Sequence, residues 1–309
     1  MKFSIVVPTY NEQDDIAGTL DALISLTYSN REIVVVDDST DNTPNIIRKY
    51  ERHGVILITP NLREGRCGAR NIGILASKGE VVVILNADVR LPPDFLDRIL
   101  IHYQNGFDYV LVKSQVSNIH SLFARYVASV ASSEESGDPS WMEWTEGFSC
   151  KRDIAIKAGL FPVGYAVPIC AGEDGYFGAE LKKIGAKKVV DFSIVVPHIA
   201  PSKFLEYWEI RKGRGRGSPQ IRRFLQKWTY RKIAIRAFLR ILRNIIFVAT
   251  LFPILFKLIK YSKYSNRGIL DIPLFGYSWL IEQLAFHVGE WSSILEIIKK
   301  EKIINKCHL

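Results

Sequence analysis

An acidic residue at the end of an apolar run is the first group in the sequence that could bind a ligand. Residues 81–85 read Val-Val-Val-Ile-Leu, and Asn86, Ala87 and Asp88 follow them. An unbroken aliphatic run is typical of a strand buried on both faces of a parallel sheet, and ligands bind beyond the carboxyl ends of such strands. A divalent cation that holds a diphosphate needs an anionic oxygen ligand, which Asp88 could supply. The alternative is that Asp88 only caps the turn before a Pro-Pro pair.

Three further acids follow the first two apolar runs of the chain. Residues 8–12 read Pro-Thr-Tyr-Asn-Glu, where a dinucleotide-binding fold would carry a glycine-rich turn. Glu12 would repel a pyrophosphate, but it could accept hydrogen bonds from a nucleobase or a ribose hydroxyl, with Tyr10 as an aromatic wall. Asp37 and Asp38 end the second run. These acids predict a nucleoside pocket beside a metal-bound diphosphate, and they disfavour a dehydrogenase.

Hydrophobic periodicity predicts the elements that must position these acids. The first ninety residues alternate between strands and helices, which predicts an α/β fold with a mostly parallel, doubly wound sheet. The predicted strands are 3–7, 33–36, 55–58 and 81–85, and the predicted helices are 12–26, a helix capped by Thr43, and 66–77. Helices at 93–101 and 119–131 and strands at 109–112 and 194–196 follow, and two tryptophans near the end of residues 132–144 either pack or stack on a sugar ring.

The basic charge of the chain is concentrated in one segment. The net charge is +9, but residues 203–243 alone hold thirteen Lys and Arg residues against two Glu. No zinc-finger spacing or ribonucleoprotein signature accompanies them, so an anionic lipid or a diphosphate is the expected partner rather than nucleic acid. Four scattered cysteines suit a reducing compartment. Residues 5–7 are too short an apolar run for a signal peptide, so we expect the catalytic domain in the cytosol.

Four motifs in the same order resemble the family 2 glycosyltransferases of the GT-A fold, the Rossmann-like fold of nucleotide-diphospho-sugar transferases. They are residues 5–12, residues 34–41, Gly-Ala-Arg-Asn-x-Gly at 68–73, and Asn-Ala-Asp at 86–88. The resemblance covers roughly residues 1–200 and includes dolichyl-phosphate mannose synthase-like and minimal cellulose synthase-like membrane enzymes. Four ordered motifs are far more specific than one short pattern.

The resemblance implies a nucleotide-sugar site with a bound Mn²⁺ or Mg²⁺. Asp88 matches the second acid of the family's Asp-x-Asp element, which touches the metal, whereas Asn86 replaces the first acid. By similarity Arg70 would face the diphosphate. The nucleotide-sugar-binding set is completed by residues at the carboxyl ends of three predicted strands: Pro8, Tyr10, Glu12, Asp37, Asp38 and Ala87.

Two residues further along the chain match other functional positions of the family. Asp174 lies in Gly-Glu-Asp-Gly at a predicted helix start, where an acid either caps the helix or acts as a general base. In family members with this element the acid takes the proton of an acceptor hydroxyl. His198 follows the last predicted strand, where members often place a further metal ligand, so its imidazole could join Asp88.

A glycine-rich basic stretch follows at residues 206–217, and its second half holds too many glycines for a stable helix. It is either a solvated linker or a flexible loop whose Arg211, Arg214 and Arg216 wrap a diphosphate leaving group. Cellulose synthase-like members carry Gln-x-x-Arg-Trp at this place, a pattern that this chain lacks.

The C-terminal region is predicted to attach to a membrane. From Phe224 onward arginines recur at intervals among apolar residues, which indicates a basic amphipathic helix. The uncharged stretch 244–256 is shorter than the roughly 20 residues of a span, and basic residues flank it on both sides. Helices in the membrane plane or a re-entrant pair fit better than a simple hairpin, and a soluble helical cap is the alternative. We therefore expect a catalytic domain at 1–202, a basic amphipathic connecting segment at 203–232 and membrane-associated helices at 233–309.

These features together predict an inverting, metal-dependent glycosyltransferase. It would move a hexose, mannose or glucose, from a nucleoside-diphosphate sugar such as GDP-mannose or UDP-glucose to a hydroxyl of a lipid-linked glycan at the cytosolic membrane face. One alternative is a polyprenyl-phosphate sugar synthase, whose phosphate acceptor is already ionised and needs no base. An alternative of another class is an inactive membrane scaffold that binds nucleotide sugars.

Overall fold

The computed structural model describes residues 1–61, 65–135 and 141–307. The chain divides into two compact units. The sheet unit comprises residues 1–115, 140–163 and 173–199, and the helical unit comprises residues 116–139, 164–172 and 200–309. Each unit is therefore built from separate stretches of the chain.

The sheet unit is built on seven strands in the order β3-β2-β1-β4-β6-β5-β7. The first four strands pair in parallel, as predicted, whereas β6 runs antiparallel to β4 and β5. The antiparallel part was not predicted. The strands are β1 (Phe3–Thr9), β2 (Arg31–Asp37), β3 (Val55–Ile58), β4 (Val81–Ile84), β5 (Tyr109–Val116), β6 (Ser149–Lys151) and β7 (Lys188–His198).

Helices cover both faces of this sheet because its central strands are apolar on both faces. Ile5 and Val7 of β1 belong to the same buried cluster as Leu20 of α1. On the other face, Val34 and Val36 of β2 lie against Ala69 of α3. The helices of the sheet unit are α1 (Ile16–Ile24), α2 (Thr43–Arg48), α3 (Gly65–Ala76), α4 (Phe95–Gln104), α6 (Arg152–Lys157) and α7 (Glu173–Lys183). Helix α2 begins at Thr43 itself, with Asn42 at the cap position predicted for Thr43.

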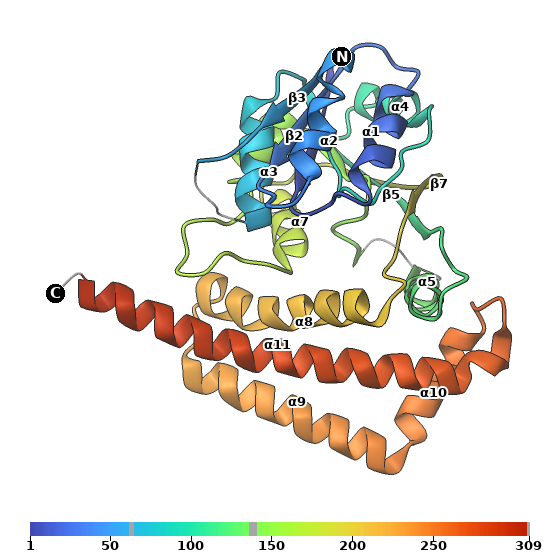
Figure 1. Ribbon diagram of the computed structural model, residues 1–309, viewed down its shortest axis with the longest axis vertical. Coiled ribbons are helices and arrows are strands. Elements are labelled where there is room, and N and C mark those ends of the chain that lie inside the picture. Colours follow the sequence, from blue (N-terminus) through green and yellow to red (C-terminus); the bar gives the residue numbers. More distant parts are fainter. Residues whose placement is uncertain (62–64, 136–140, 308–309) are drawn as a thin grey trace. The chain divides into compact units, whose positions relative to one another are not determined.

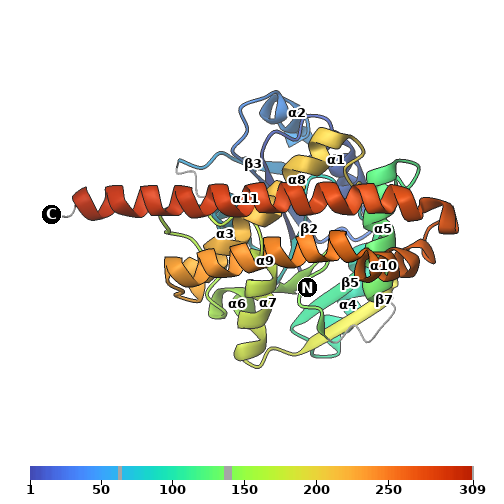
Figure 2. The same cartoon turned by 90° about the horizontal axis from the view of Figure 1, so that it is seen from below.

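The helical unit contains five α-helices in its described part. They are α5 (Leu122–Glu135), α8 (Phe204–Gln220), α9 (Tyr230–Thr250), α10 (Phe252–Ser262) and α11 (Ile272–Cys307), with a π-helical turn at Ile221–Leu225 and a 3-10 turn at Gly268–Asp271. Helix α11 lies between α8 and α9, and α5 crosses near α10 (Figures 1 and 2). A sharp bend separates α9 from α10, where Leu251 has a φ of 56°. Pro253 follows at the start of α10, and its missing N–H cannot continue the hydrogen bonds of α9.

The prediction that the second half of residues 206–217 is too rich in glycine for a stable helix is wrong. Helix α8 is continuous from Phe204 to Gln220. Gly215 is a point of close contact with α11, because a Cβ there would overlap the carbonyl oxygen of Phe286. A Cβ on Gly289 of α11 would overlap the carbonyl oxygen of Lys212 in the same way. Close packing between the two helices compensates for the low helix propensity of glycine.

Replacing Gly215 with alanine is expected to lower the free energy of unfolding by about 1 to 3 kcal/mol, because the new methyl group must push α8 from α11. Gly213 of α8 is the matched control, since a Cβ there meets no described atom within 4 Å. Gly213→Ala should stabilise the helix by about 0.5 to 1 kcal/mol. Urea unfolding followed by circular dichroism compares the two variants. Equal stability of both would show that α8 and α11 are not closely packed in solution.

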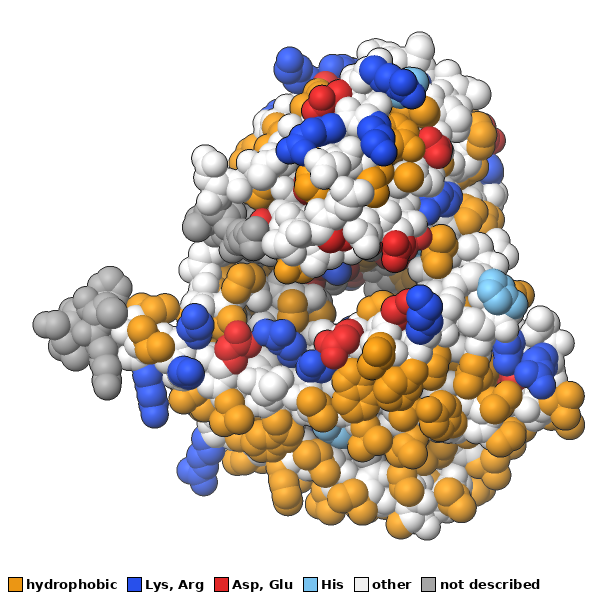
Figure 3. Space-filling view, viewed as in Figure 1, with side chains coloured by type: hydrophobic (Ala, Val, Ile, Leu, Met, Phe, Trp, Pro, Cys, Tyr) orange, Lys and Arg blue, Asp and Glu red, His pale blue; other side chains and the backbone are white. Residues whose placement is uncertain are grey.

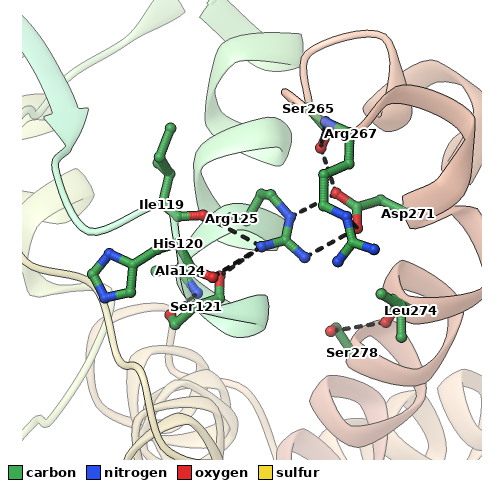
Figure 4. Close-up of polar contacts among 10 residues, drawn as sticks. All are labelled: Ile119, His120, Ser121, Ala124, Arg125, Ser265, Arg267, Asp271, Leu274 and Ser278. Atoms are coloured by element: carbon green, nitrogen blue, oxygen red, sulfur yellow. Dashed lines mark hydrogen bonds and ion pairs between the residues drawn. The ribbon is translucent and has the colours of Figure 1, made fainter.

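A buried ion pair fastens α5 to the start of α11 (Figure 4). Arg125 donates from Nε and Nη2 to the two carboxylate oxygens of Asp271, at 2.6 and 3.0 Å. Its Nη1 donates to the backbone carbonyls that precede α5, and Ser265 donates to Asp271 as well. A bidentate pair with its remaining donors satisfied is the arrangement in which buried charges are stable. Helix α5 is thereby held within the helical unit.

Candidate functional site

Asp88 follows β4 at the carboxyl edge of the parallel strands, as predicted. Its backbone carbonyl accepts a hydrogen bond from the Ile199 N–H at 3.1 Å, and the next residue, Val89, forms a β-bridge with His198. The end of β7 therefore brings His198 beside the residues that follow β4. Burial raises the pKa of Asp88, and its Oδ1 has no hydrogen-bond partner among the described residues. A partly buried carboxylate with an unpaired oxygen is suited to a cation.

The predicted nucleoside residues lie at the adjoining ends of β1 and β2. Thr9 and Asp37 are register partners, and the Thr9 hydroxyl donates to Asp37 at 2.6 Å. Asp37 is buried, whereas Tyr10 is 57% exposed and Pro8 and Asp38 are partly exposed. Asp37 thus shapes the turn, and the groups around it are the accessible ones. These positions agree with a pocket at this edge, whose contacts with a nucleoside stay a prediction.

The acids at this edge repel one another. Burial, followed by the negative charges of Asp88 and Asp15, raises the pKa of Glu12 to about 7. A bound cation would reduce the repulsion between these carboxylates and favour their ionised forms. Within the described ranges, no group of three His, Cys, Asp or Glu side chains is placed to hold a metal ion. Metal binding by Asp88 and His198 stays a prediction.

Arg70 lies at the centre of a second cluster, on α3. It is fully buried, its Nη1 lies 3.1 Å from Glu173 Oε1, and the same nitrogen contacts Asp174. The rings of Trp144 and Phe161 lie 5.1 and 5.0 Å from its guanidinium carbon. These contacts fix the guanidinium in position and orientation. The role predicted for Arg70 at the diphosphate stays a prediction, since the polar groups that it contacts here belong to the protein.

The two acids that contact Arg70 differ in exposure. Glu173 is fully buried, and burial together with the charge of Asp174 raises its pKa. The Asp174 side chain is 30% exposed. Both lie in the first turn of α7, so the predicted helix start is confirmed. Of the two carboxylates, Asp174 is the one that could reach a substrate.

Glu146 is a member of this cluster that was not singled out from the sequence. The Asn86 side-chain amide donates to both of its carboxylate oxygens at 3.1 Å, and Asn86 Oδ1 accepts from Arg70 Nη2 at 3.3 Å. Burial, followed by the charges of Asp88 and Asp174, raises the pKa of Glu146 to about 7. Glu146 reaches Asn86 because β6 pairs with β4 in antiparallel register. The short strand after Glu146 was the sequence feature that could have drawn attention to this residue, but the strand with which β6 pairs could not be inferred.

The remaining predicted candidates are two tryptophans and three arginines, and of these Trp144 belongs to the cluster around Arg70. Trp144 stacks on Phe148 with ring centroids 4.3 Å apart, so it is a packing residue, whereas Trp141 is 58% exposed. In the helical unit Arg211 lies 3.3 Å from Glu282, and Arg216 lies 2.8 Å from Glu296. Arg214 is exposed. Arg211 and Arg216 thus form ion pairs with carboxylates of α11. The role of the three arginines at a diphosphate stays a prediction.

The sheet unit thus has a seven-stranded mixed sheet with acids at or just after the ends of β1, β2 and β4. The chain belongs to glycosyl transferase family 2, whose sequence profile matches residues 4–161. It is similar to two solved structures, for which the likeness shows the GT-A fold. The mannosyltransferase PcManGT from Pyrobaculum calidifontis in complex with GDP-Man and Mn²⁺ has a TM-score of 0.54 at 23% identity, over 70% of this chain and 61% of that one. S. aureus TarS 1–349 with UDP-GlcNAc has a TM-score of 0.55 at 16% identity, over 94% and 91%.

Curated relatives match about a third of the chain. The UDP-Glc:alpha-D-GlcNAc-diphosphoundecaprenol beta-1,3-glucosyltransferase WfaP of Escherichia coli is 40% identical over 86 residues, which are 28% of this chain and 34% of that protein. The undecaprenyl-phosphate 4-deoxy-4-formamido-L-arabinose transferase of Edwardsiella ictaluri is 35% identical over 114 residues, 35% of each chain. The matched stretches span about a third of these relatives.

Proposed function

We propose that the protein is an inverting glycosyltransferase that moves a hexose from a nucleoside-diphosphate sugar to a hydroxyl of a lipid-linked glycan. The observation that carries the proposal is the placement of Asp174. It is the accessible acid of a pair that the buried Arg70 holds at the first turn of α7. A carboxylate held in this way can take the proton of an acceptor hydroxyl while the diphosphate leaves.

We propose Mn²⁺ or Mg²⁺ as the cofactor, held by Asp88 and His198. The fit rests on the unpaired Oδ1 of Asp88 and on the repulsion between Asp88 and Glu12. A neighbour in fold, PcManGT, contains Mn²⁺ together with GDP-Man. A bound cation would neutralise the charge that develops on the diphosphate leaving group. Tyr10, Glu12 and Asp38, with Pro8, would hold the nucleoside.

The acceptor is proposed from the names of the relatives. The WfaP glucosyltransferase acts on a sugar linked to diphosphoundecaprenol, which supports a hydroxyl acceptor on a lipid-linked glycan. The arabinose transferase is named for undecaprenyl phosphate, which supports the alternative of a polyprenyl-phosphate sugar synthase. For the donor, GDP-mannose and UDP-glucose remain the first candidates, because PcManGT binds the former and WfaP is named for the latter.

We propose that α9 and α10 attach the protein to the cytosolic membrane face. Hydrophobic side chains gather over the lower part of the helical unit in Figure 3. Along α9 and α10 the exposed fractions reach 59% for Phe238, 76% for Phe252 and 69% for Phe256. In the described part of the chain no single helix is long and apolar enough to cross a membrane, although α9 and α10, which meet at 82°, pass the same test together. An amphipathic pair with flanking Lys and Arg is suited to an anionic interface.

The attachment surface is tested by placing acids in it. The double change Phe252→Glu and Phe256→Glu is expected to lower binding to vesicles of mixed zwitterionic and anionic lipids by about 10-fold or more, because each buried phenyl ring contributes about 1.5 to 3 kcal/mol. Ile101→Glu on α4, at a residue that is 56% exposed, is the control and should sediment like the wild type. If the double variant also sediments like the wild type, the attachment lies elsewhere in the chain.

The experiment that tests the function is a donor screen against a membrane lipid extract, with mass spectrometry of the glycolipids. A hexosylated lipid-linked glycan made with one donor is the expected result. A polyprenyl-phosphate sugar would support the synthase alternative. Binding of a nucleotide sugar with no metal-dependent release of nucleoside diphosphate would support an inactive scaffold.

A further inference from the structure

A chain of polar contacts links Glu146 to Asp174 through two intervening side chains. Glu146 accepts from the Asn86 amide, Asn86 accepts from Arg70, and Arg70 contacts Asp174. The four residues come from four parts of the sheet unit: the segment before β6, the segment after β4, α3 and α7. This series of contacts therefore depends on the tertiary structure, and no local sequence motif predicts it.

Asn86 can take only one amide orientation between its two neighbours. Its NH₂ group faces the carboxylate of Glu146 at 3.1 Å from both oxygens, and its carbonyl oxygen faces Arg70 at 3.3 Å. The flipped amide would place an oxygen against a carboxylate and an NH₂ group against a guanidinium, which costs all three hydrogen bonds and places like charges against each other on both sides. The carboxylate of Glu146 thereby selects the face that Asn86 presents to Arg70.

Arg70 has little freedom once Asn86 is fixed. The rings of Trp144 and Phe161 lie over the guanidinium, while its Nη1 meets the two acids and its Nη2 meets Asn86. A rotation in the guanidinium plane would break the contact with Asn86 and move Nη1 away from Asp174. Loss of the Nη2 acceptor would also leave a buried donor unpaired, which favours such a rotation.

We propose that Glu146 is a positioning residue for transfer, which sets the place of the Asp174 carboxylate through Asn86 and Arg70. This inference rests on the proposed function, since it gives Asp174 the role of base. Among the described residues no hydrogen bond or ion pair joins Glu146 to Asp174 directly. Its effect is on the geometry of proton transfer, and a displacement of about 1 Å can cost as much as 10²-fold in rate.

The test is a double-mutant cycle that combines variants of Glu146 with a variant of Asp174. Glu146→Ala is expected to lower kcat by about 10 to 10²-fold, with the Kd for the nucleoside-diphosphate sugar within about threefold of wild type. Glu146→Gln, whose amide oxygen can still accept from Asn86, should keep kcat within about threefold of wild type. In the Asp174→Asn background, Glu146→Ala should lower kcat no further, because the group on which it acts has lost its basicity.

Two outcomes would overturn the inference. If Glu146→Ala weakens donor binding by the same factor as it lowers kcat, Glu146 acts in the donor pocket instead. Glu146→Ala that lowers kcat equally in the wild-type and Asp174→Asn backgrounds would show that it does not act through Asp174. Failure of the proposed function is distinguishable, because it would show as absent transfer in the wild type or full transfer in Asp174→Asn alone.

Discussion

Replacement of Asp174 by asparagine is expected to lower the turnover of sugar transfer by about 10²-fold or more while donor binding survives. Asparagine keeps the shape of the side chain and removes its basicity. The neighbouring Glu173 cannot replace it, because that carboxylate is fully buried against Arg70. Initial rates with saturating donor and acceptor give kcat, and calorimetry with the nucleoside-diphosphate sugar gives the binding constant.

Asp153→Asn is the matched control for the helix-capping alternative. Asp153 lies in the first turn of α6, as Asp174 lies in the first turn of α7, and it is exposed. Loss of an acid at a helix N-terminus costs about 0.3 to 1 kcal/mol of stability, which should leave turnover unchanged. Near wild-type turnover of Asp174→Asn would remove the base from the account and favour a phosphate acceptor.

Replacement of Asp88 by alanine is expected to abolish metal-dependent transfer. Asp88 is the carboxylate at the end of β4, and its Oδ1 has no hydrogen-bond partner among the described residues. His198→Ala should weaken Mn²⁺ binding by about 10 to 100-fold and leave activity that returns at high Mn²⁺. Titration of Mn²⁺ into each variant, with transfer and bound metal as separate readouts, measures both effects.

The control for Asp88 is Asp94→Ala, in which an acid is removed just before α4. Asp94 is 59% exposed and stands at the cap position of that helix, so it represents the alternative that acids near this turn serve only as caps. It should transfer sugar with the metal dependence of the wild type. Full transfer by Asp88→Ala in the presence of a chelator would contradict the metal site.

The positions of the strands and of the acids at their ends were predictable because local sequence determines them. The apolar runs that end at Asp37 and before Asn86 are long enough to identify buried parallel strands, and their order fixes which ends meet. The position of Asp174 in the first turn of a helix was predictable as well, since small residues precede the helix start at Glu173.

Contacts between distant segments were not predictable in the same way. Glu146 contacts Asn86 because the three-residue strand β6 lies between β4 and β5. So short a strand has no sequence pattern from which its neighbouring strands could be predicted. Likewise, the glycines of α8 favour a loop when judged by propensity alone. They favour a helix only when α11 supplies a close partner, and that partner lies about seventy residues further along the chain.

The anomeric configuration of the transferred sugar is the most direct measurement of the proposed reaction. Nuclear magnetic resonance of the product made from a donor of known configuration reports it. A single displacement in which Asp174 takes the acceptor proton has no covalent intermediate, so the product should be a glycoside of a lipid-linked glycan with inverted configuration. A product with retained configuration would contradict the single displacement and with it the assignment of Asp174 as the base.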